Sequence, residues 1–170
     1  MIYFVSILDL RMARTVRRFL LRLALEQAIG REEKAYRFYE AAMEAVGAPE
    51  AAQLLRRLAA EELRHRLKLE DLQRSGELDP AGIVEMNPGQ EKILMEPEPQ
   101  WPQAIDRLSV RDIWSAALSK ERRARDYYRL LAARAPAASF REVFAYLSAE
   151  EQRHVDWVQS ALQAQGGAQG

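Results

Sequence analysis

The chain has 170 residues, and its 25 Lys or Arg are balanced by 25 Asp or Glu, so its formal net charge is zero. This length suits one domain with a complete hydrophobic core, and the balanced charge excludes a general electrostatic attraction to nucleic acid or to anionic membranes. The absence of Cys excludes disulfides, thiolate metal sites and Cys nucleophiles within these residues, and it fits a reducing compartment such as the cytoplasm, where we expect the protein to reside.

An N-terminal helical extension is predicted for residues 1–24. Its apolar run from Ile2 to Leu8 is too short to span a bilayer. Arg residues follow this run rather than precede it, which argues against a secretory signal. We expect the extension to pack on the rest of the protein or on a second subunit, in a homodimer. The alternatives are a helix that lies on a membrane surface and a translation start at Met12.

Four bundle helices are predicted from apolar residues that recur at intervals of three and four, because this spacing produces one buried stripe along a helix. The first helix reaches about Val46, the second begins near Pro49 and ends at Gly76, the third follows Ser109 as N-cap, and the fourth follows Pro136. Consecutive helices form two hairpins with short turns. The predicted fold is therefore an all-α four-helix bundle over residues 25–162, followed by a flexible tail at 163–170.

Residues 77–108 are predicted to connect the two hairpins. Five of the seven Pro lie in this segment, and Pro interrupts regular structure. A bundle with one long crossover needs such a connection, and we expect it to run along the length of the bundle; a disordered linker is the alternative. The apolar residues expected to anchor it are Ile83, Val84, Ile93, Leu94 and Trp101.

An internal repeat, offset by 89 residues, contains the candidate metal ligands. In each copy a single Glu precedes a Glu-x-x-His motif by the same 30 residues. The His residues of these motifs are the only two His in the chain. The candidate ligands are Glu32, Glu62 and His65 in the first copy and Glu121, Glu151 and His154 in the second.

The spacing of the repeat indicates a metal site inside the bundle. Residues three apart share a helix face, so the Glu and His of each motif can reach the same ion. The midpoint between the two Glu of each copy falls at a turn residue, Gly47 in the first and Pro136 in the second, so each pair lies level on its hairpin. Two single Glu and two Glu-x-x-His motifs are the ligand set of two-metal helical bundles. Four carboxylates also balance two divalent cations, and would be costly to bury without them.

Two further pairs of repeated residues lie next to the candidate ligands. Glu61 and Glu150 fall one position off the buried stripe, so we expect them to be solvated or paired with the helix dipole, with a ligand role as the alternative. Tyr39 and Tyr128 each lie seven residues after a ligand-type Glu, on the same helix face. Each Tyr is expected either to pack in the core or to support the chemistry through a hydrogen bond to a ligand carboxylate.

The repeated motifs resemble those of the rubrerythrin-like branch of the ferritin-like superfamily, over about residues 25–162. The matching segments are Ala28-Ile29-x-x-Glu32-x-x-Ala35-x-x-Phe38-Tyr39 with Glu61-Glu62-x-x-His65, and Ala117-Leu118-x-x-Glu121-x-x-Ala124-x-x-Tyr127-Tyr128 with Glu150-Glu151-x-x-His154. The resemblance implies a ferritin-like bundle and a carboxylate-bridged di-iron centre, in which the bridges are either Glu62 and Glu151 or Glu32 and Glu121. It also implies reaction with peroxide or dioxygen.

The sequence departs from this family pattern at two points. Full-length rubrerythrins have a rubredoxin-type domain with a cysteine-ligated iron, whereas these residues contain no Cys, so we expect electrons to come from an external donor protein. Rubrerythrins also have a further Glu ligand three residues after the Glu of the third helix, where this chain has Ala124.

Three functions are compatible with the predicted site. The first is an oxidoreductase that reduces hydrogen peroxide or dioxygen at two iron ions, although a His and carboxylate donor set also suits manganese or a mixed-metal centre. Quinone-hydroxylating and manganese-catalase-like enzymes share this ligand plan. The second function is iron handling, by ferroxidation with storage, and the third is a sensor or a bundle that its metal only stabilises. We expect no nucleic-acid partner and no integral membrane segment.

Overall fold

The computed structural model describes residues 7–75, 105–135 and 138–167, with side chains described over 22–165 of these ranges. All regular structure in this part of the chain is helical, which confirms the all-α prediction. The elements are α1 (Ile7–Ala45), α2 (Pro49–Arg74), the short 3-10 helix η1 (Ile105–Arg107), α4 (Val110–Arg134) and α5 (Ala138–Gly167).

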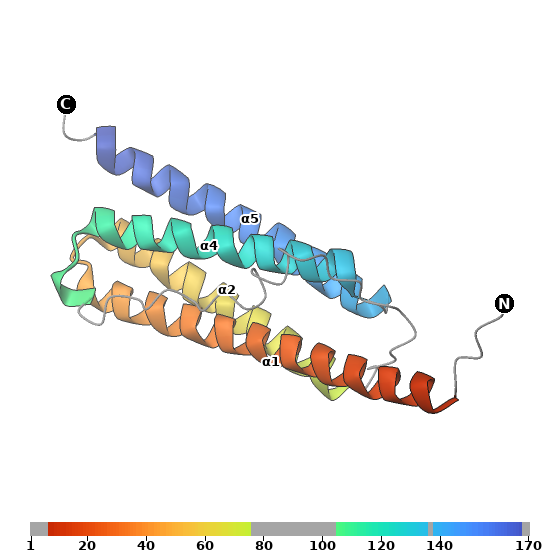
Figure 1. Ribbon diagram of the computed structural model, residues 1–170. Helices are drawn as coiled ribbons and strands as arrows, with labels where there is room; N and C mark the ends of the chain where they lie inside the picture. Colours follow the sequence, from red (N-terminus) through yellow and green to blue (C-terminus); the bar gives the residue numbers. More distant parts are fainter. Residues whose placement is uncertain (1–6, 76–104, 136–137, 168–170) are drawn as a thin grey trace.

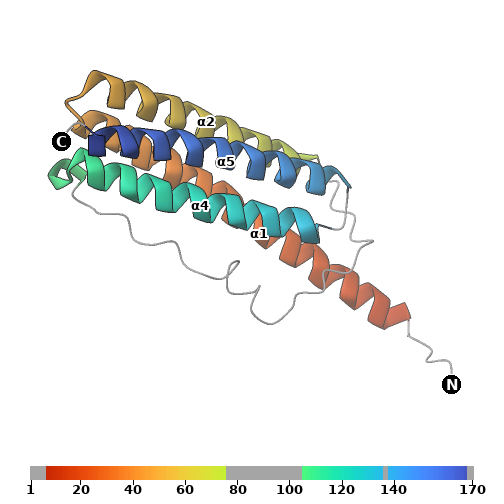
Figure 2. The same ribbon diagram turned by 90° about the horizontal axis from the view of Figure 1, so that it is seen from above.

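The four long helices form a bundle of two hairpins (Figure 1). Helix α1 packs mainly against α2, and α4 packs mainly against α5, which confirms the predicted pairing. Far fewer contacts join one hairpin to the other. The N-terminal part of α1 continues past the end of the other helices (Figure 2), so the extension predicted for residues 1–24 is helical from Ile7 and continuous with the first bundle helix.

The two hairpins are joined between opposite ends of the bundle. Helix α2 ends near the turn that joins α4 to α5, whereas η1 and the start of α4 lie beside the turn that joins α1 to α2 (Figures 1 and 2). The end of the first hairpin and the start of the second therefore lie at opposite ends of the bundle, as in a bundle with one long crossover. The anchors expected within it, Ile83 to Trp101, lie outside the described residues. The predicted tail overlaps the end of α5, which reaches Gly167.

The helix ends follow the local chemistry of the sequence. Ser109 caps α4: its side chain accepts a hydrogen bond from the backbone N–H of Asp112, while the Asp112 carboxylate accepts one from the backbone N–H of Ser109. This reciprocal capping box satisfies two N–H groups that the helix itself leaves unpaired and confirms the predicted cap. Pro49 occupies the first turn of α2, where its missing N–H has no cost.

Two apolar clusters fill the interior, one toward each end of the bundle. On α1, Ala28 belongs to the first cluster and Phe38 to the second, so the midpoint of the bundle lies between them. The first core cluster is Leu25, Ala28, Leu69, Leu72, Ala124, Tyr127, Tyr128, Leu131, Ala135, Phe140, Phe144 and Leu147. The second core cluster is Phe38, Tyr39, Ala42, Val46, Ala51, Leu55, Leu58, Ala59, Ile113, Trp114, Ala117 and Val158.

The two core clusters are related by the sequence repeat. Most members of the first cluster have a counterpart 89 residues away in the second; Leu147 corresponds to Leu58, for example, and Tyr128 to Tyr39. The bundle therefore has an approximate twofold symmetry that exchanges the two hairpins and the two clusters. Residues near the symmetry axis must lie between the two clusters.

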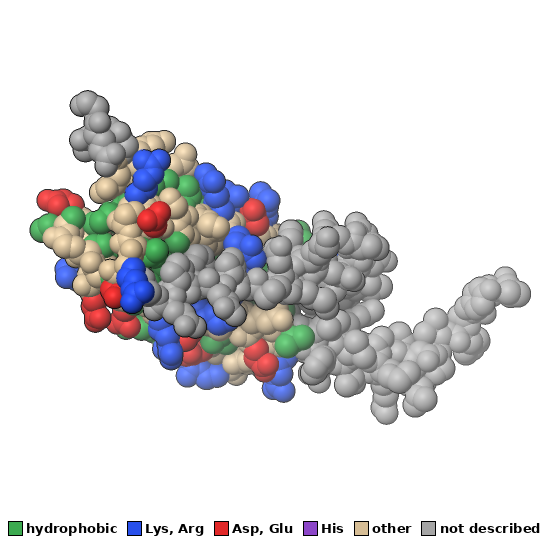
Figure 3. Space-filling model, turned by 60° about the vertical axis from the view of Figure 1, so that its left-hand side comes forward, with side chains coloured by type: hydrophobic (Ala, Val, Ile, Leu, Met, Phe, Trp, Pro, Cys, Tyr) green, Lys and Arg blue, Asp and Glu red, His purple; other side chains and the backbone are tan. Residues whose placement is uncertain are grey.

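The charge on one face of the molecule can be compared with the balanced charge of the sequence. Basic and acidic side chains are mixed over the face shown in Figure 3, in agreement with the balanced composition. Leu23, Leu67 and Tyr146 are the exposed large hydrophobic residues among those described. No helix in the described ranges is both long enough and apolar enough to cross a membrane.

Candidate metal centre

The six predicted ligands converge at the middle of the bundle, between the two core clusters. Each of the four long helices contributes: α1 and α4 one Glu each, α2 and α5 a Glu and a His each. None of the six residues is more than 1% exposed. The buried stripe predicted from the sequence therefore places all of them in the interior. They are Glu32, Glu62, His65, Glu121, Glu151 and His154.

These side chains form two overlapping groups of four. Within each group, one potential ligand atom per residue lies within 4.8 Å of the others. The first group contains Glu32 and His65, the second contains Glu121 and His154, and both groups include Glu62 and Glu151. Such an arrangement is suited to two ions that share two carboxylates. It favours Glu62 and Glu151, rather than Glu32 and Glu121, as the bridging pair.

The oxygens of the shared carboxylates are divided between the two imidazoles. His65 Nδ1 lies 3.2 Å from Glu151 Oε1 and 3.9 Å from Glu62 Oε2. His154 Nδ1 lies 3.4 Å from the opposite oxygen of each, Glu151 Oε2 and Glu62 Oε1. Each shared carboxylate thus presents one oxygen to each side. This is the orientation that a carboxylate needs to bridge two ions.

The remaining Glu residues serve one side each. Glu32 Oε2 lies 3.6 Å from His65 Nδ1, and Glu121 Oε2 lies 3.3 Å from His154 Nδ1. The two imidazoles are stacked, with ring centroids 5.3 Å apart and an interplanar angle of 18°. The centre therefore has a terminal Glu and a His on each side and two shared carboxylates between them.

Several buried polar atoms at this centre have no hydrogen-bond partner. Leaving such an atom unpaired costs on the order of 1–3 kcal/mol, and more for a charged group, so a cluster of them calls for an explanation. Oxygen and imidazole nitrogen donors are ligands for divalent transition metals, and coordination would satisfy the atoms that face one another here. The donor set therefore fits a metal centre. The unpaired atoms of the six are Glu32 Oε2, Glu62 Oε1, both Glu151 oxygens, both His65 nitrogens and His154 Nε2.

The two repeated Tyr hydrogen-bond the terminal carboxylates across the bundle. The Tyr39 hydroxyl on α1 donates to Glu121 Oε1 on α4, and the Tyr128 hydroxyl on α4 donates to Glu32 Oε1 on α1. Both rings also belong to the core clusters, so the two roles left open by the sequence occur together. Burial, followed by the charge of the carboxylates, raises the pKa of both Tyr well above 10. Both phenols therefore keep their protons and remain donors.

Without metal, the terminal and shared carboxylates differ in charge. Burial opposes ionisation of Glu32, but its interactions with Glu62, His65 and Tyr128 favour the charged form, outweigh burial and lower its pKa to about 2. The pKa of Glu121 is lowered in the same way, with His154 as the main partner against burial. Burial and the charge of neighbouring carboxylates raise the pKa of Glu62 well above its ordinary value. The terminal carboxylates thus stay ionised while the shared ones tend to hold protons.

Glu151 and the two imidazoles also have shifted pKa values in the metal-free protein. Burial and the nearby Glu121 raise the pKa of Glu151 to about 7. Burial would lower the pKa of His65, but the nearby carboxylates of Glu151 and Glu32 favour the protonated ring and raise it to about 11, and the pKa of His154 is raised for the same reason. Protons therefore neutralise the metal-free centre. Metal ions that bind here must displace them, so metal affinity should increase with pH.

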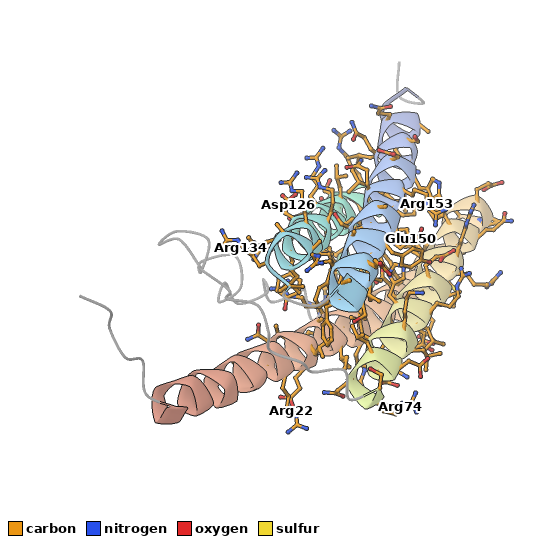
Figure 4. All side chains as sticks on the ribbon, turned by 90° about the vertical axis from the view of Figure 1, so that its right-hand side faces the viewer. Arg22, Arg74, Asp126, Arg134, Glu150 and Arg153 are labelled. Atoms are coloured by element: carbon orange, nitrogen blue, oxygen red, sulfur yellow. The ribbon has the colours of Figure 1, made fainter. Side chains whose placement is uncertain are left out.

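The prediction that Glu61 and Glu150 are solvated is wrong. Each is only 8% exposed, because the packing of α2 against α5 covers both. Figure 4 shows Glu150 and Arg153 on the side of α5 that faces α2. Each Glu is paired with the Arg three residues later, Glu61 with Arg64 and Glu150 with Arg153. This repeated Glu-x-x-Arg spacing was a signal in the sequence that could have indicated partnered rather than solvated carboxylates.

Sequence reasoning also missed a layer of aromatic and basic residues over the imidazoles. The Trp157 ring lies 5.4 Å from the His154 ring, and the Arg57 guanidinium lies 3.8 Å from the centroid of Trp157. Lys68 Nζ lies 4.5 Å from the Tyr146 centroid. The repeat relates position 57 to 146 and position 68 to 157. The two cation–π pairs are therefore repeat counterparts, but in both the cation is on α2 and the ring is on α5, so each repeated position holds a cation in one copy and a ring in the other.

Ala124, at the position of the further Glu ligand expected from the resemblance, is part of the first core cluster. It is 9% exposed and packs among apolar side chains. The position therefore offers no carboxylate to the centre. Among the described residues, the only acidic side chain grouped with these His and lying outside the six is Glu61.

The fold and the converging side chains define an all-helical bundle protein with a buried Glu and His site that could bind metal. The sequence model of the rubrerythrin family matches residues 12–108, more than half of the chain, and the chain belongs to this family. The match covers the hairpin of α1 and α2 and ends before α4. Comparison with curated proteins and with solved structures gave no match. The contribution of the second hairpin to the site therefore rests on the repeat and on the geometry.

Proposed function

We propose that this protein is a di-iron carboxylate oxidoreductase that reduces hydrogen peroxide or dioxygen with electrons from an external donor protein. The observation that supports this most strongly is the pair of shared carboxylates. Glu62 and Glu151 each present one oxygen to either side of the centre, so two ions would be held next to each other. Two adjacent redox metals suit a two-electron reduction better than one.

In this proposal Glu32 and His65 hold one ion, Glu121 and His154 hold the other, and the shared carboxylates bind both. Four carboxylates neutralise two divalent cations. The family favours iron, while the donor types alone would also accept manganese or a mixed pair. Two irons would supply two electrons and Lewis acidity to a bound O–O bond.

The residues of the chain hold the ligands and exclude water. Tyr39 and Tyr128 each donate to one oxygen of a terminal carboxylate, which orients the other oxygen toward the centre, as supporting hydrogen bonds do for metal ligands. The two core clusters close the bundle on either side. Because the sequence has no Cys, no thiolate-bound electron carrier lies within these residues, and each turnover would require an external reductant.

The test is an anaerobic titration with ferrous iron, followed by stopped-flow mixing with each oxidant. We expect two irons per chain, and oxidation by one hydrogen peroxide per iron pair that is faster than oxidation by dioxygen. Repeated turnover should require an added electron-donor protein. A faster reaction with dioxygen would favour an oxidase, hydroxylase or ferroxidase, and ferroxidation with storage would also produce large assemblies in light scattering. Bound metal that reacts with neither oxidant would show that the metal is structural.

A further inference from the structure

In each imidazole of the centre, only one of the two ring nitrogens faces the carboxylates that would hold the ions. Nδ1 of His65 and Nδ1 of His154 face the carboxylates that would hold the ions, at distances of 3.2–3.9 Å. Nε2 of each ring is buried and has no hydrogen-bond partner. An imidazole that binds a metal through Nδ1 carries its proton on Nε2, and this N–H needs an acceptor.

Glu61 is the acidic side chain placed to accept from both rings. One of its carboxylate oxygens lies within 4.8 Å of a ring nitrogen of His65 and of a ring nitrogen of His154. Because Nδ1 of each ring faces the central carboxylates, Nε2 is the nitrogen left for Glu61. The two rings are stacked, and one carboxylate lies close enough to reach a nitrogen of each.

We propose that Glu61 is a positioning residue, which accepts hydrogen bonds from Nε2–H of both His65 and His154 and so holds both rings with Nδ1 toward the metal ions. The inference rests on the proposed metal centre. Arg64 pairs with Glu61 from the solvent side, so the proposed acceptor is a carboxylate that belongs to an ion pair. A charged acceptor forms a stronger hydrogen bond than a neutral one and makes a metal-bound imidazole a better donor ligand.

Glu150 is an internal control, because the repeat places it at the equivalent position. It has the same 8% exposure and the same pairing with an Arg three residues later. Yet Glu150 belongs to none of the potential metal-binding groups of the described residues. The surroundings of the two imidazoles differ as well, because Trp157 packs against His154, whereas its counterpart Lys68 lies over Tyr146. The symmetry of the bundle is thus broken at the layer just outside the ligands.

The experiment compares Glu61→Leu with Glu150→Leu by competitive zinc titration of the full chain. Both substitutions bury a similar apolar side chain and remove one Arg partner. We expect Glu61→Leu to weaken zinc binding by about 10–100-fold, the usual effect of losing a carboxylate partner of a ligand His. Glu150→Leu should bind zinc as the wild type does. Circular dichroism and melting curves of both variants show whether each is folded.

Imidazole NMR supplies a measurement that a purely structural role would not change. In the zinc-loaded wild type, both His should show slowly exchanging Nε2–H protons, and Glu61→Leu should make them exchange faster while Glu150→Leu does not. If either Leu variant fails to fold, Glu61→Gln and Glu150→Gln give the same comparison, because Gln keeps the acceptor oxygen but not its charge. We then expect a several-fold loss of affinity for the first and none for the second.

Equal zinc affinities and equal proton exchange in the two Glu variants would overturn the role of Glu61 while leaving the metal centre intact. A wild-type protein that binds no zinc and no iron would overturn the proposed function, and the inference with it. The wild-type titration therefore separates the two failures.

Discussion

The two hairpins have the same ligand pattern but contribute core side chains of different size around it. Phe140 and Phe144 on α5 pack in the first core cluster, whereas their counterparts in the second are Ala51 and Leu55. The second cluster instead contains Trp114, where the first has Leu25. The large side chains of the two clusters come from different helices. Cores tolerate such substitutions when the total side-chain volume is conserved.

The difference shows which positions are constrained by chemistry and which by volume. The three ligand types, the Tyr that supports the opposite terminal Glu and the Glu-x-x-Arg pair are identical in both copies. Positions that only pack have changed size, and at the repeated positions of the cation–π pairs a cation in one copy corresponds to a ring in the other. The candidate centre helps to join the hairpins, because its Tyr hydrogen bonds cross between them, whereas most close helix packing lies within each hairpin.

The largest effect on metal binding is expected from removing a carboxylate that belongs to both groups of ligands. Glu62→Ala should abolish at least one metal position and weaken the other, because Glu62 belongs to both groups of ligands. Glu32→Ala should affect mainly one position, because Glu32 belongs to one group. Metal analysis after gel filtration gives the stoichiometry of each variant. Full occupancy by two ions in Glu62→Ala would show that this carboxylate is not shared.

The second largest effect is expected from removing the metal, because ions bound at the proposed centre would have ligands from both hairpins. A ligand that binds only the folded state at 100 times its Kd stabilises it by about 2.7 kcal/mol, so each lost ion should lower Tm by roughly 5–10 °C for a domain of this length. Calorimetry with and without a chelator measures the change. Hydrogen exchange should increase first at the contacts between hairpins. An unchanged Tm would show that the site binds no ion tightly.

The metal-free protein should become more stable as the pH falls from about 7 to 5. Glu151, with a folded pKa of about 7, and Glu62, with a pKa raised well above 4.5, hold protons that the unfolded chain has released. The folded state therefore gains stability as they protonate. His65, whose pKa is raised from 6.5 to about 11, contributes fully only below its unfolded value of 6.5. Both trends favour the folded state at mildly acidic pH.

Below pH 4.5 the direction should reverse. Glu32 has a folded pKa of about 2 against an ordinary value of 4.5, so the unfolded chain takes up that proton first and stability falls as the pH drops further. Urea denaturation of the metal-free protein between pH 3 and pH 8, at constant ionic strength, should give a maximum near pH 5. A steady loss of stability from pH 7 to pH 5 would contradict the protonation pattern of the shared carboxylates.

The sequence was sufficient for the features that depend on periodicity. Apolar spacing and turn residues located the hairpins, and because each ligand continues a buried stripe, the same periodicity brought all six to one place. The bridging pair could not be chosen, because it depends on which oxygen of Glu62 and Glu151 faces which imidazole. Spacing along a helix does not determine carboxylate rotamers.

The environment of Glu61 and Glu150 could not be predicted for a different reason. Both lie beside the buried stripe of their helix, where burial depends on how closely α2 approaches α5. The apolar periodicity of a single helix does not determine the distance between two helices. The pairing of Arg57 with Trp157 has the same origin, because it joins side chains from two helices 100 residues apart. The repeat relates equivalent positions, but it does not show which of them meet across the bundle.

The smallest loss of stability is expected from substituting Tyr39 or Tyr128. Comparing these two variants tests directly whether the two halves of the centre are equivalent. Tyr39→Phe and Tyr128→Phe each remove one buried hydrogen bond and leave a terminal carboxylate oxygen unpaired, at a cost of about 1–3 kcal/mol. Because the two Tyr are repeat counterparts, we expect similar losses in urea denaturation of the metal-loaded protein. Tyr36→Phe is a matched control, since its hydroxyl bonds Glu40 at a part-buried position outside the centre, and it should change stability little. A large loss for one of the buried Tyr and none for the other would show that the two halves of the centre are not equivalent, even at the residues that the repeat leaves unchanged.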